Sequence, residues 1–130
     1  MASRKLEDLA PQFRDRFLAW LGACKERGMD LLVTCTYRSK AEQDAEYAKG
    51  RTVPGRKVTN AQAGQSAHNF GLALDFVPME NGRPQWNAEH PAWRQAGNLC
   101  PTYGLEWGGS WSKFRDMPHV QVPSWKGLVQ

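Results

Sequence analysis

The chain has 130 residues, 41% of them hydrophobic and 23% charged, with a formal net charge of +4 at pH 7. This length suits one domain with a single hydrophobic core and leaves no room for a second, separate domain. The apolar runs are too short to cross a bilayer and the basic residues are scattered along the chain, so the composition argues against a membrane protein and against a nucleic-acid-binding protein.

The first predicted element is an amphipathic helix from Pro11 to Gly28. Proline suits the first turn of a helix and glycine suits its end. The preceding SRKLEDL adds a short helical turn. Apolar residues recur in the helix at three- and four-residue steps: Phe13, Phe17, Leu21 and Cys24.

A buried strand over residues 30–38 is predicted next. The segment DLLVTCTYR is rich in β-branched and apolar residues, which favour a strand inside a sheet. The carboxyl end of this strand delivers Tyr37, Arg38 and Ser39 to one edge of the fold.

A second helix and a long loop follow this strand. Ser39 and Glu42 have the spacing of a capping box, which predicts a helix that ends at Gly50. Residues 51–65 contain turn formers without a stable period and therefore predict a long loop. Loops of this length are uncommon in compact domains and often carry function.

The second half of the chain begins with a predicted strand from Leu72 to Val77. Residues 79–91 follow as a loop with an Asn-Gly turn signal, and a third helix is expected over about residues 91–99. LEWGG and HVQV predict two more short strands. Helices among short strands, with no βαβ alternation, predict an α+β fold with a short mixed or antiparallel sheet in a single domain of residues 1–130.

Asp75 stands out because it lies within an apolar strand. Strand alternation places Ala73, Asp75 and Val77 on one face, and the small alanine leaves space beside the carboxylate. A buried carboxylate without a partner is strongly unfavourable, so the site must supply a cation or hydrogen-bond donors. A turn cap and an arginine pair remain the alternatives to a metal.

Two histidines complete a candidate metal site with Asp75. His68 lies in a turn shaped by Gly71, where a chain reversal brings the imidazole back over the start of the strand. His119 opens the apolar strand HVQV, whereas His90 lies in a polar loop and is expected to be structural. Two imidazoles and one carboxylate suit Zn²⁺ and leave a fourth position for water, as catalytic zinc sites do.

The cysteines and tryptophans are expected to be structural. The cysteines are odd in number, widely spaced and without a C-x-x-C pair, which indicates neither a disulfide framework nor a thiolate zinc site. We expect small core residues at Cys24, Cys35 and Cys100. Core or edge packing is expected of four tryptophans, with a groove for sugar or peptide as the alternative: Trp86, Trp93, Trp107 and Trp111.

Several motifs together resemble the LAS-type (M15) zinc peptidases of the cell wall. YRS at 37–39, GRTVPGRKVT, SAHNFGLALD, GLEWGGSW and DMPH occur in the family's order over roughly residues 30 to 122, and S-x-H-x-x-G-x-A-x-D is the most specific part. Through GRT-x-PG-x-x-VT and GLEWGG the chain is most similar to the L-alanyl-D-glutamate endopeptidases, which include phage endolysins. D-alanyl-D-alanine carboxypeptidases and dipeptidases are related.

The resemblance implies a hedgehog/DD-peptidase-like fold with one zinc ion per chain, bound by His68, Asp75 and His119. It also implies that Asp116 is the general base, which takes a proton from the attacking water and returns it to the leaving amine. The alternative for Asp116 is a turn-forming aspartate before Pro118.

Substrate contacts are implied by the resemblance as well. Arg38 is expected to face the substrate and stabilise the charge that develops on the carbonyl oxygen. Ser66 is expected to lie near the bound peptide. A structural salt bridge is the alternative for Arg38, and a turn or cap is the alternative for Ser66. Ser110 departs from the family pattern, in which many relatives have an acidic residue.

The implied activity is hydrolysis of the L-Ala-D-Glu bond in peptidoglycan stem peptides by a phage-type cell-wall lysin. A D,D-carboxypeptidase or dipeptidase acting on D-Ala-D-Ala termini and a non-catalytic wall-binding module are the alternatives. We expect a monomer without a separate cell-wall-binding domain, made in the cytoplasm because no secretory signal is visible. Reaching the wall would then require a membrane-permeabilising, holin-like partner, with no nucleic acid and no stable membrane association.

Overall fold

The computed structural model describes residues 2–129, within which three α-helices are joined to the strands by loops and short 3-10 helices. The expected helices are confirmed, including the short turn before the first. None of the helices in residues 2–129 has the length and apolar character that a membrane crossing requires. The α-helices are α1 (Pro11–Glu26), α2 (Lys40–Ala48) and α3 (Pro91–Gly97), and the 3-10 helices are η1 (Leu6–Asp8), η2 (Ala67–Phe70), η3 (Cys100–Tyr103), η4 (Gly108–Ser110) and η5 (Trp125–Leu128).

Local signals define the helix ends. The predicted capping box of α2 is present: the hydroxyl oxygen of Ser39 accepts the backbone N–H of Glu42 at 3.1 Å, and the Glu42 carboxylate accepts the N–H of Ser39 at 2.9 Å. Helix α3 ends at Gly97, two residues earlier than expected. The backbone tightens there into η3, whose Pro101 has no N–H to continue an α-helix.

Within residues 2–129, five strands form one antiparallel sheet, which confirms the predicted α+β class. The path runs β1-β2-β5-β4, and β3 pairs with the distal end of β2. Strand β2 is therefore central, between β1 and β5. The strands are β1 (Leu31–Cys35), β2 (Ala73–Glu80), β3 (Arg83–Pro84), β4 (Glu106–Trp107) and β5 (His119–Gln121).

Two predicted strand boundaries are wrong. Strand β1 ends at Cys35 because the next residues leave β2: Thr36 donates its backbone N–H to Ser3 and Arg38 donates to His68. Strand β2 runs on to Glu80, so the expected loop over residues 79–91 begins as a hairpin. Its Asn-Gly turn has positive φ at both positions, 53° and 76°, as a tight hairpin with right-handed twist requires.

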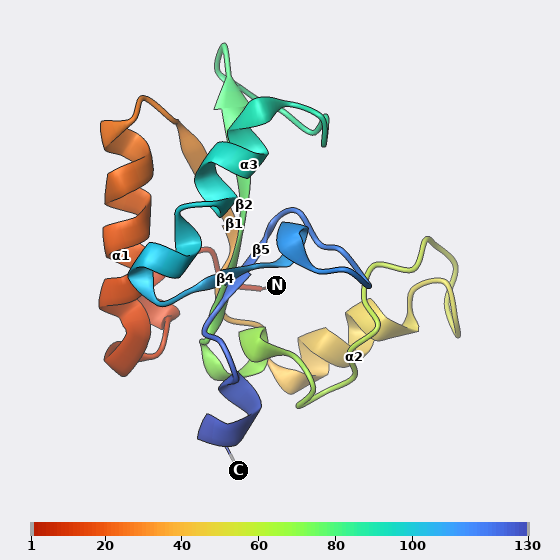
Figure 1. Ribbon diagram of the computed structural model, residues 1–130. Coiled ribbons are helices and arrows are strands. Elements are labelled where there is room, and N and C mark those ends of the chain that lie inside the picture. The colour runs from red at the N-terminus through yellow and green to blue at the C-terminus, as the bar shows by residue number, and fades with distance from the viewer. Residues whose placement is uncertain (1, 130) are drawn as a thin grey trace.

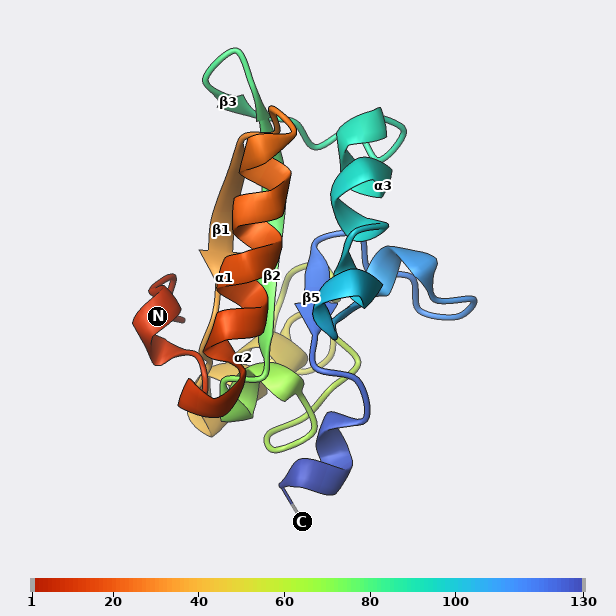
Figure 2. The ribbon, with the colours of Figure 1, turned by 60° about the vertical axis from the view of Figure 1, so that its left-hand side comes forward.

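The hydrophobic core lies between the sheet and helices α1 and α3. The ring of Phe76 on β2 lies 5.3 Å from both Trp20 of α1 and Trp93 of α3, centroid to centroid. The indole N–H of Trp20 donates to the carbonyl of Ala96 at 2.8 Å, so the two helices are also joined by a buried hydrogen bond. Figure 2 shows α1 lying along β1 and β2 with α3 beside it.

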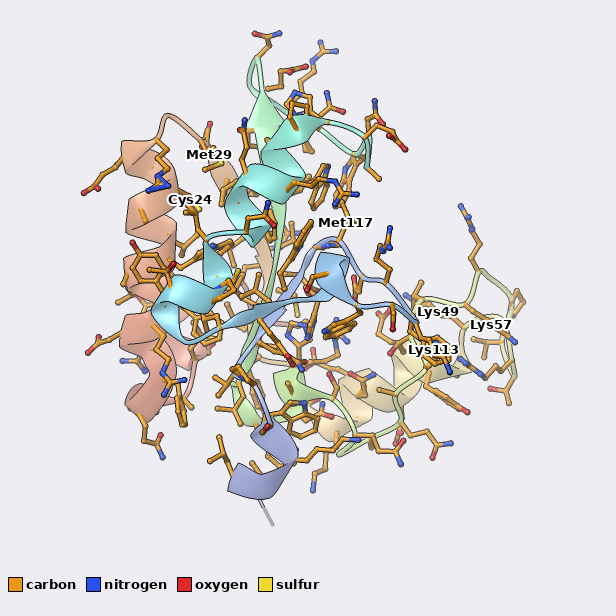
Figure 3. The ribbon with its side chains drawn as sticks, in the orientation of Figure 1. Cys24, Met29, Lys49, Lys57, Lys113 and Met117 are labelled. Atoms are coloured by element: carbon orange, nitrogen blue, oxygen red, sulfur yellow. The ribbon has the colours of Figure 1, made fainter. Side chains whose placement is uncertain are left out.

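The opposite side of the strands carries α2 and the long loop. Figure 1 shows α1 and α2 on opposite sides of β1 and β2. Figure 3 labels Cys24 on the inner side of α1, and Lys49 and Lys57 at the far end of α2 and in the loop that follows it. Burial raises the pKa of the Cys24 thiol to about 11, so this cysteine is the neutral core residue that the sequence predicts.

Candidate functional site

A row of three side chains crosses the sheet on the α2 side. In the strand register Cys35 of β1 lies opposite Asp75 of β2, and Asp75 lies opposite His119 of β5. Directly opposite residues in antiparallel strands have their side chains close together on one face. The register therefore brings Asp75 and His119 together although they are far apart in the sequence.

His68 reaches the same row from η2. Its turn closes at Gly71, which has φ of 69° and lies so close to the N-terminal segment that a Cβ atom there would be 2.8 Å from the backbone nitrogen of Ala10. Only glycine fits this position. The chain reversal predicted from the sequence is therefore confirmed, and it lays the buried imidazole of His68 beside the start of β2.

The two imidazoles converge on one carboxylate oxygen. Nε2 of His68 lies 3.1 Å from Oδ1 of Asp75, and Nδ1 of His119 lies 3.3 Å from the same oxygen. The two rings are 5.1 Å apart, centroid to centroid, and nearly perpendicular. All three side chains that the resemblance assigns to zinc thus lie within one small volume.

The hydrogen bonds of the rings orient their lone pairs toward Asp75. Nδ1 of His68 lies 2.8 Å from the carbonyl oxygen of Thr36, and a carbonyl only accepts, so Nδ1 carries the hydrogen. Nε2 of His119 lies 2.6 Å from the amide oxygen of Gln121 and carries its hydrogen for the same reason. In the neutral rings, the nitrogens that face Asp75 are therefore unprotonated.

This arrangement fits a bound cation. Two lone pairs and a carboxylate oxygen would repel one another unless a proton or a metal ion lies between them. Burial disfavours a charged His68, but the Asp75 carboxylate overcomes this and raises the pKa of His68 to about 10. Burial likewise opposes a charged Asp75, yet His68 and His119 hold its pKa well below the ordinary value. The site therefore favours a bound positive charge. Two nitrogens and one oxygen are a ligand set that suits zinc.

Cys35 is a site residue that the sequence prediction missed. Its sulfur lies 3.6 Å from Nδ1 of His68, and Cys35, His68 and Asp75 offer ligand atoms within 4.8 Å of one another. The thiol is buried, as expected, but it belongs to the row with Asp75 and His119 and not to the apolar core cluster. Because it lies beside the ring nitrogen that donates to Thr36, it adjoins the edge of His68 opposite the nitrogen that faces Asp75.

Asp116 lies in the same groove, held by its backbone. Its N–H donates to the carbonyl of Gly108 at 3.0 Å, and its carbonyl accepts the N–H of His119 at 3.2 Å. The indole of Trp107 donates to the next carbonyl, that of Met117, at 2.7 Å. The turn before Pro118 is therefore real, and it also places Asp116 in the groove. Partial loss of hydration raises the pKa of Asp116 above the ordinary aspartate value.

Arg38 lines the groove, and among residues 2–129 it makes no structural salt bridge of the kind considered from the sequence. Its guanidinium donates to the side-chain oxygen of Gln43 at 2.9 Å and to the sulfur of Cys35 at 3.6 Å. Its Nε is buried without a hydrogen-bond partner. Gln43, which is fully buried, donates in turn to the carbonyl of Ala61 at 2.6 Å, so it joins Arg38 to the long loop.

Ser66 caps η2, as one of its two interpretations states. Its hydroxyl oxygen accepts the backbone N–H of His68 at 3.3 Å, and Ser66 also lines the groove. Ser110 is exposed and donates to the carbonyl of Trp107 at 2.7 Å. His90 is structural, as expected: it accepts the N–H of Ala92 at the start of α3 and lies 2.7 Å from the Glu80 carboxylate.

The site opens into a groove of about 1090 Å³. Trp86 and Trp111 line it, while Trp93 and Trp107 belong to the buried core, so the tryptophans divide between the two interpretations. The ring of Trp111 lies 5.5 Å from that of His119. Among the other lining residues are members of the long loop: Val58, Thr59, Asn60 and Ala61.

Comparisons with known proteins agree with this geometry. Residues 59–122 match a family model described as D-alanyl-D-alanine carboxypeptidase. The chain is 37% identical over 123 residues to the peptidoglycan L-alanyl-D-glutamate endopeptidase CwlK of Bacillus subtilis, covering 88% of this chain and 74% of that protein. It is 31% identical to the L-alanyl-D-glutamate peptidase of Listeria phage A118, of which it spans 40%.

Solved structures share the fold. The L-Ala D-Glu endopeptidase ChiX of Serratia marcescens superposes with a TM-score of 0.72 at 22% identity, covering all of this chain and 93% of ChiX. The LD-carboxypeptidase LdcB superposes with a TM-score of 0.71 at 21% identity, over 88% of this chain and 58% of LdcB. With the similarity to CwlK across most of both sequences, the chain belongs to the LAS-type (M15) family of zinc peptidases.

Proposed function

We propose that this chain is a zinc-dependent endopeptidase that hydrolyses the L-Ala-D-Glu bond of peptidoglycan stem peptides and acts as a cell-wall lysin. The observation that carries the proposal is the convergence of His68 Nε2 and His119 Nδ1 on Asp75 Oδ1 inside an open groove. The names of the two sequence relatives, both L-alanyl-D-glutamate peptidases, support the choice of bond.

In this proposal His68, Asp75 and His119 hold one zinc ion per chain. When bound, such an ion lowers the pKa of water toward about 7 and polarises a peptide carbonyl. The three side chains are well suited to this role, because Thr36 and Gln121 fix both rings and neither imidazole needs to turn. The binding geometry is thus prepared by the fold.

Asp116 serves as the general base and Arg38 as an electrostatic partner of the substrate. Partial desolvation raises the pKa of Asp116, which makes its carboxylate a better proton acceptor than an ordinary aspartate near neutral pH. It takes a proton from the attacking water and returns it to the leaving amine. Arg38 lines the groove, where its positive charge would stabilise the oxygen on which negative charge develops. Ser66, on the groove wall, contacts the peptide.

A D,D-carboxypeptidase or dipeptidase is the second candidate. The family model that matches residues 59–122 carries the name D-alanyl-D-alanine carboxypeptidase, which favours it. A non-catalytic wall-binding module is a weaker alternative, because a module without hydrolysis has no use for a carboxylate whose pKa is raised beside the metal-binding row.

The remaining expectations form part of the same proposal. Residues 2–129 act as one domain and as a monomer. The substrate lies in the cell wall, which the protein reaches from the cytoplasm with the help of a membrane-permeabilising, holin-like partner. The groove and the net charge of +4 then provide the affinity for the wall.

Digestion of defined muropeptides, with and without a chelator, tests the proposed function. Mass analysis should detect fragments with a new N-terminal D-Glu from the zinc-loaded protein and none after chelation. Released terminal D-Ala would instead establish the second candidate. If the zinc-loaded protein bound the cell wall but left the muropeptides intact, only the non-catalytic wall-binding module would remain as a candidate.

A further inference from the structure

His119, the proposed metal ligand on β5, belongs to a series of hydrogen-bonded side chains that leads from the groove to β4. Nε2 of His119 lies 2.6 Å from Oε1 of Gln121, and Nε2 of Gln121 donates to Oε1 of Glu106 at 2.5 Å. His119 and Gln121 are two residues apart on β5 and share a face, while Glu106 of β4 lies directly opposite Gln121.

The carboxylate at the end of this chain determines the direction of every hydrogen bond in it. An ionised glutamate only accepts, so Gln121 must turn its NH₂ group toward Glu106. Its amide oxygen then faces His119, and Nε2 of His119 must donate. Nδ1, which faces Asp75, is left with its lone pair.

We propose that Gln121 and Glu106 are positioning residues that hold His119 in the tautomer able to bind zinc. Gln121 lines the groove and Glu106 lies behind it, and the proposal rests on the proposed role of His119 as a ligand. Partners of this kind orient a metal-binding imidazole and raise its basicity. Without Glu106 the amide of Gln121 is free to flip, and a flipped amide would donate to Nε2 and place the hydrogen of His119 on Nδ1.

His68 and His119 are therefore fixed by different means. Nδ1 of His68 donates to a backbone carbonyl, which no side-chain substitution removes. His119 depends on two side chains, and the neighbour of Gln121 on β2 is Ala73, whose small side chain leaves room for the amide. Substitution of Gln121 or Glu106 should therefore change the tautomer of His119 and leave the tautomer of His68 unchanged.

Glu106→Gln tests the proposal because it keeps the shape of the side chain and removes the charge that sets the polarity. Zinc titration of the metal-free protein against a competing chelator should give a dissociation constant weaker by about 10- to 100-fold. Gln121→Met, which keeps similar bulk without an acceptor, should weaken zinc binding by a similar factor. The double variant should lose no more zinc affinity than the more severely affected single variant, because both substitutions break the same series of hydrogen bonds.

The tautomer itself provides a readout that is independent of zinc and of activity. Nitrogen-15 NMR of the metal-free protein should report neutral His119 with its hydrogen on Nε2, the nitrogen that faces the amide oxygen of Gln121. In Glu106→Gln a form of His119 with hydrogen on Nδ1 should appear, whereas the signals of His68, whose Nδ1 donates to Thr36, should be the same as in the parent chain. This measurement is informative even if the muropeptide assay fails.

Glu80→Gln is the matched control. It removes the carboxylate of another close carboxylate–histidine pair, Glu80 and His90, 2.7 Å apart and away from the groove, and it should leave zinc binding unchanged. A thermal melt of each variant confirms that it folds. The proposal is overturned if Glu106→Gln and Gln121→Met bind zinc like the parent chain, or if His119 keeps the same tautomer in Glu106→Gln.

Discussion

Strand β2 separates two regions with opposite physical character. On one side Phe76 packs between the rings of Trp20 and Trp93, and burial of these apolar surfaces stabilises the fold. On the other side Asp75, the preceding residue, gathers two imidazoles around its carboxylate in a groove. Adjacent positions on one strand thus serve stability and chemistry separately, and the rigid core fixes the strand that carries the site.

The two regions differ in whether they need a bound cation. The aromatic core is complete in the chain as it folds. The groove side buries the imidazoles of His68 and His119 and half-buries the Asp75 carboxylate, and these groups are most favourable when a cation joins them. Substitutions in the two regions should therefore have separable effects, on unfolding in one case and on metal binding or turnover in the other.

The largest expected effect follows from removing a proposed ligand. His68→Ala takes one of two nitrogens from the donor set, and a site with one imidazole and one carboxylate has too few ligands to hold zinc tightly. We expect metal analysis of the purified variant to show less than stoichiometric zinc, near zero after dialysis, together with loss of hydrolysis. Full zinc occupancy would remove His68 from the ligand set.

Phe76→Ala is the control from the other region. It should lower the free energy of unfolding by about 3 to 5 kcal/mol, the usual loss for a buried aromatic ring. Molecules that remain folded should still bind one zinc ion. If this variant instead lost zinc selectively while keeping its stability, the two regions would not be separable.

Asp116→Asn should have the next largest effect, on chemistry alone. The amide has nearly the same shape but cannot accept the proton of the attacking water. We expect zinc binding to be kept and kcat to fall by at least about 10²-fold, in line with general-base contributions. Single-turnover hydrolysis of a defined stem peptide measures this, and an unchanged kcat would show that Asp116 only forms the turn before Pro118.

Gly108→Ala tests whether the backbone contacts of Asp116 matter for turnover. A Cβ atom at this position would overlap the carbonyl oxygen of Asp116, so the loop must shift. Displacement of a catalytic group by about 1 Å can cost up to 10²-fold, and we expect kcat to fall by about 10- to 10²-fold with zinc retained.

Gly22 in α1 provides the matched control for that substitution. A Cβ atom there meets nothing within 4 Å, and Gly22→Ala should leave kcat unchanged while stabilising the helix by about 0.5 to 1 kcal/mol. Equal kcat losses in both variants would mean that the effect is not specific to the contact with Asp116.

The sequence predicts those parts of the molecule that depend on neighbouring residues. The capping box of α2 and the Asn-Gly turn involve residues at most three apart, and both are present. The choice of Asp75 follows from its apolar strand. In each case a local rule of backbone chemistry determines the outcome, so no knowledge of the tertiary structure is needed.

The residues that were missed depend on register and on packing between distant segments. Cys35 reaches the site only because β1 ends opposite Asp75, and Glu106 matters only because β4 pairs with β5. Gln43 is buried where α2 meets the long loop. Nothing in the spacing of these residues indicates a contact, and the same register that creates them also ended β1 earlier than its apolar composition predicts.

The smallest expected effect concerns the pH dependence of stability in the metal-free protein. The pKa of His68 rises to about 10 in the folded chain from about 6.5 unfolded, so its stabilisation is complete below about pH 6.5 and is lost as the pH rises toward 10. The pKa of Asp75 is lowered on folding, so its stabilisation is present above about pH 4 and is lost as the pH falls. Maximum stability should lie between these limits.

Urea unfolding of chelator-treated protein at about pH 7 and about pH 8 measures this dependence. One proton lost per molecule weakens the folded state by at most about 1.4 kcal/mol per pH unit, so the urea midpoint should be lower at the higher pH. In His68→Ala the decline should disappear. Zinc should reverse the trend in the parent chain, because the ion competes with the proton for His68 and binds more tightly as the pH rises. A midpoint that rises with pH in the metal-free parent chain would mean that His68 is not charged beside Asp75, and the groove would then not concentrate positive charge as its geometry requires.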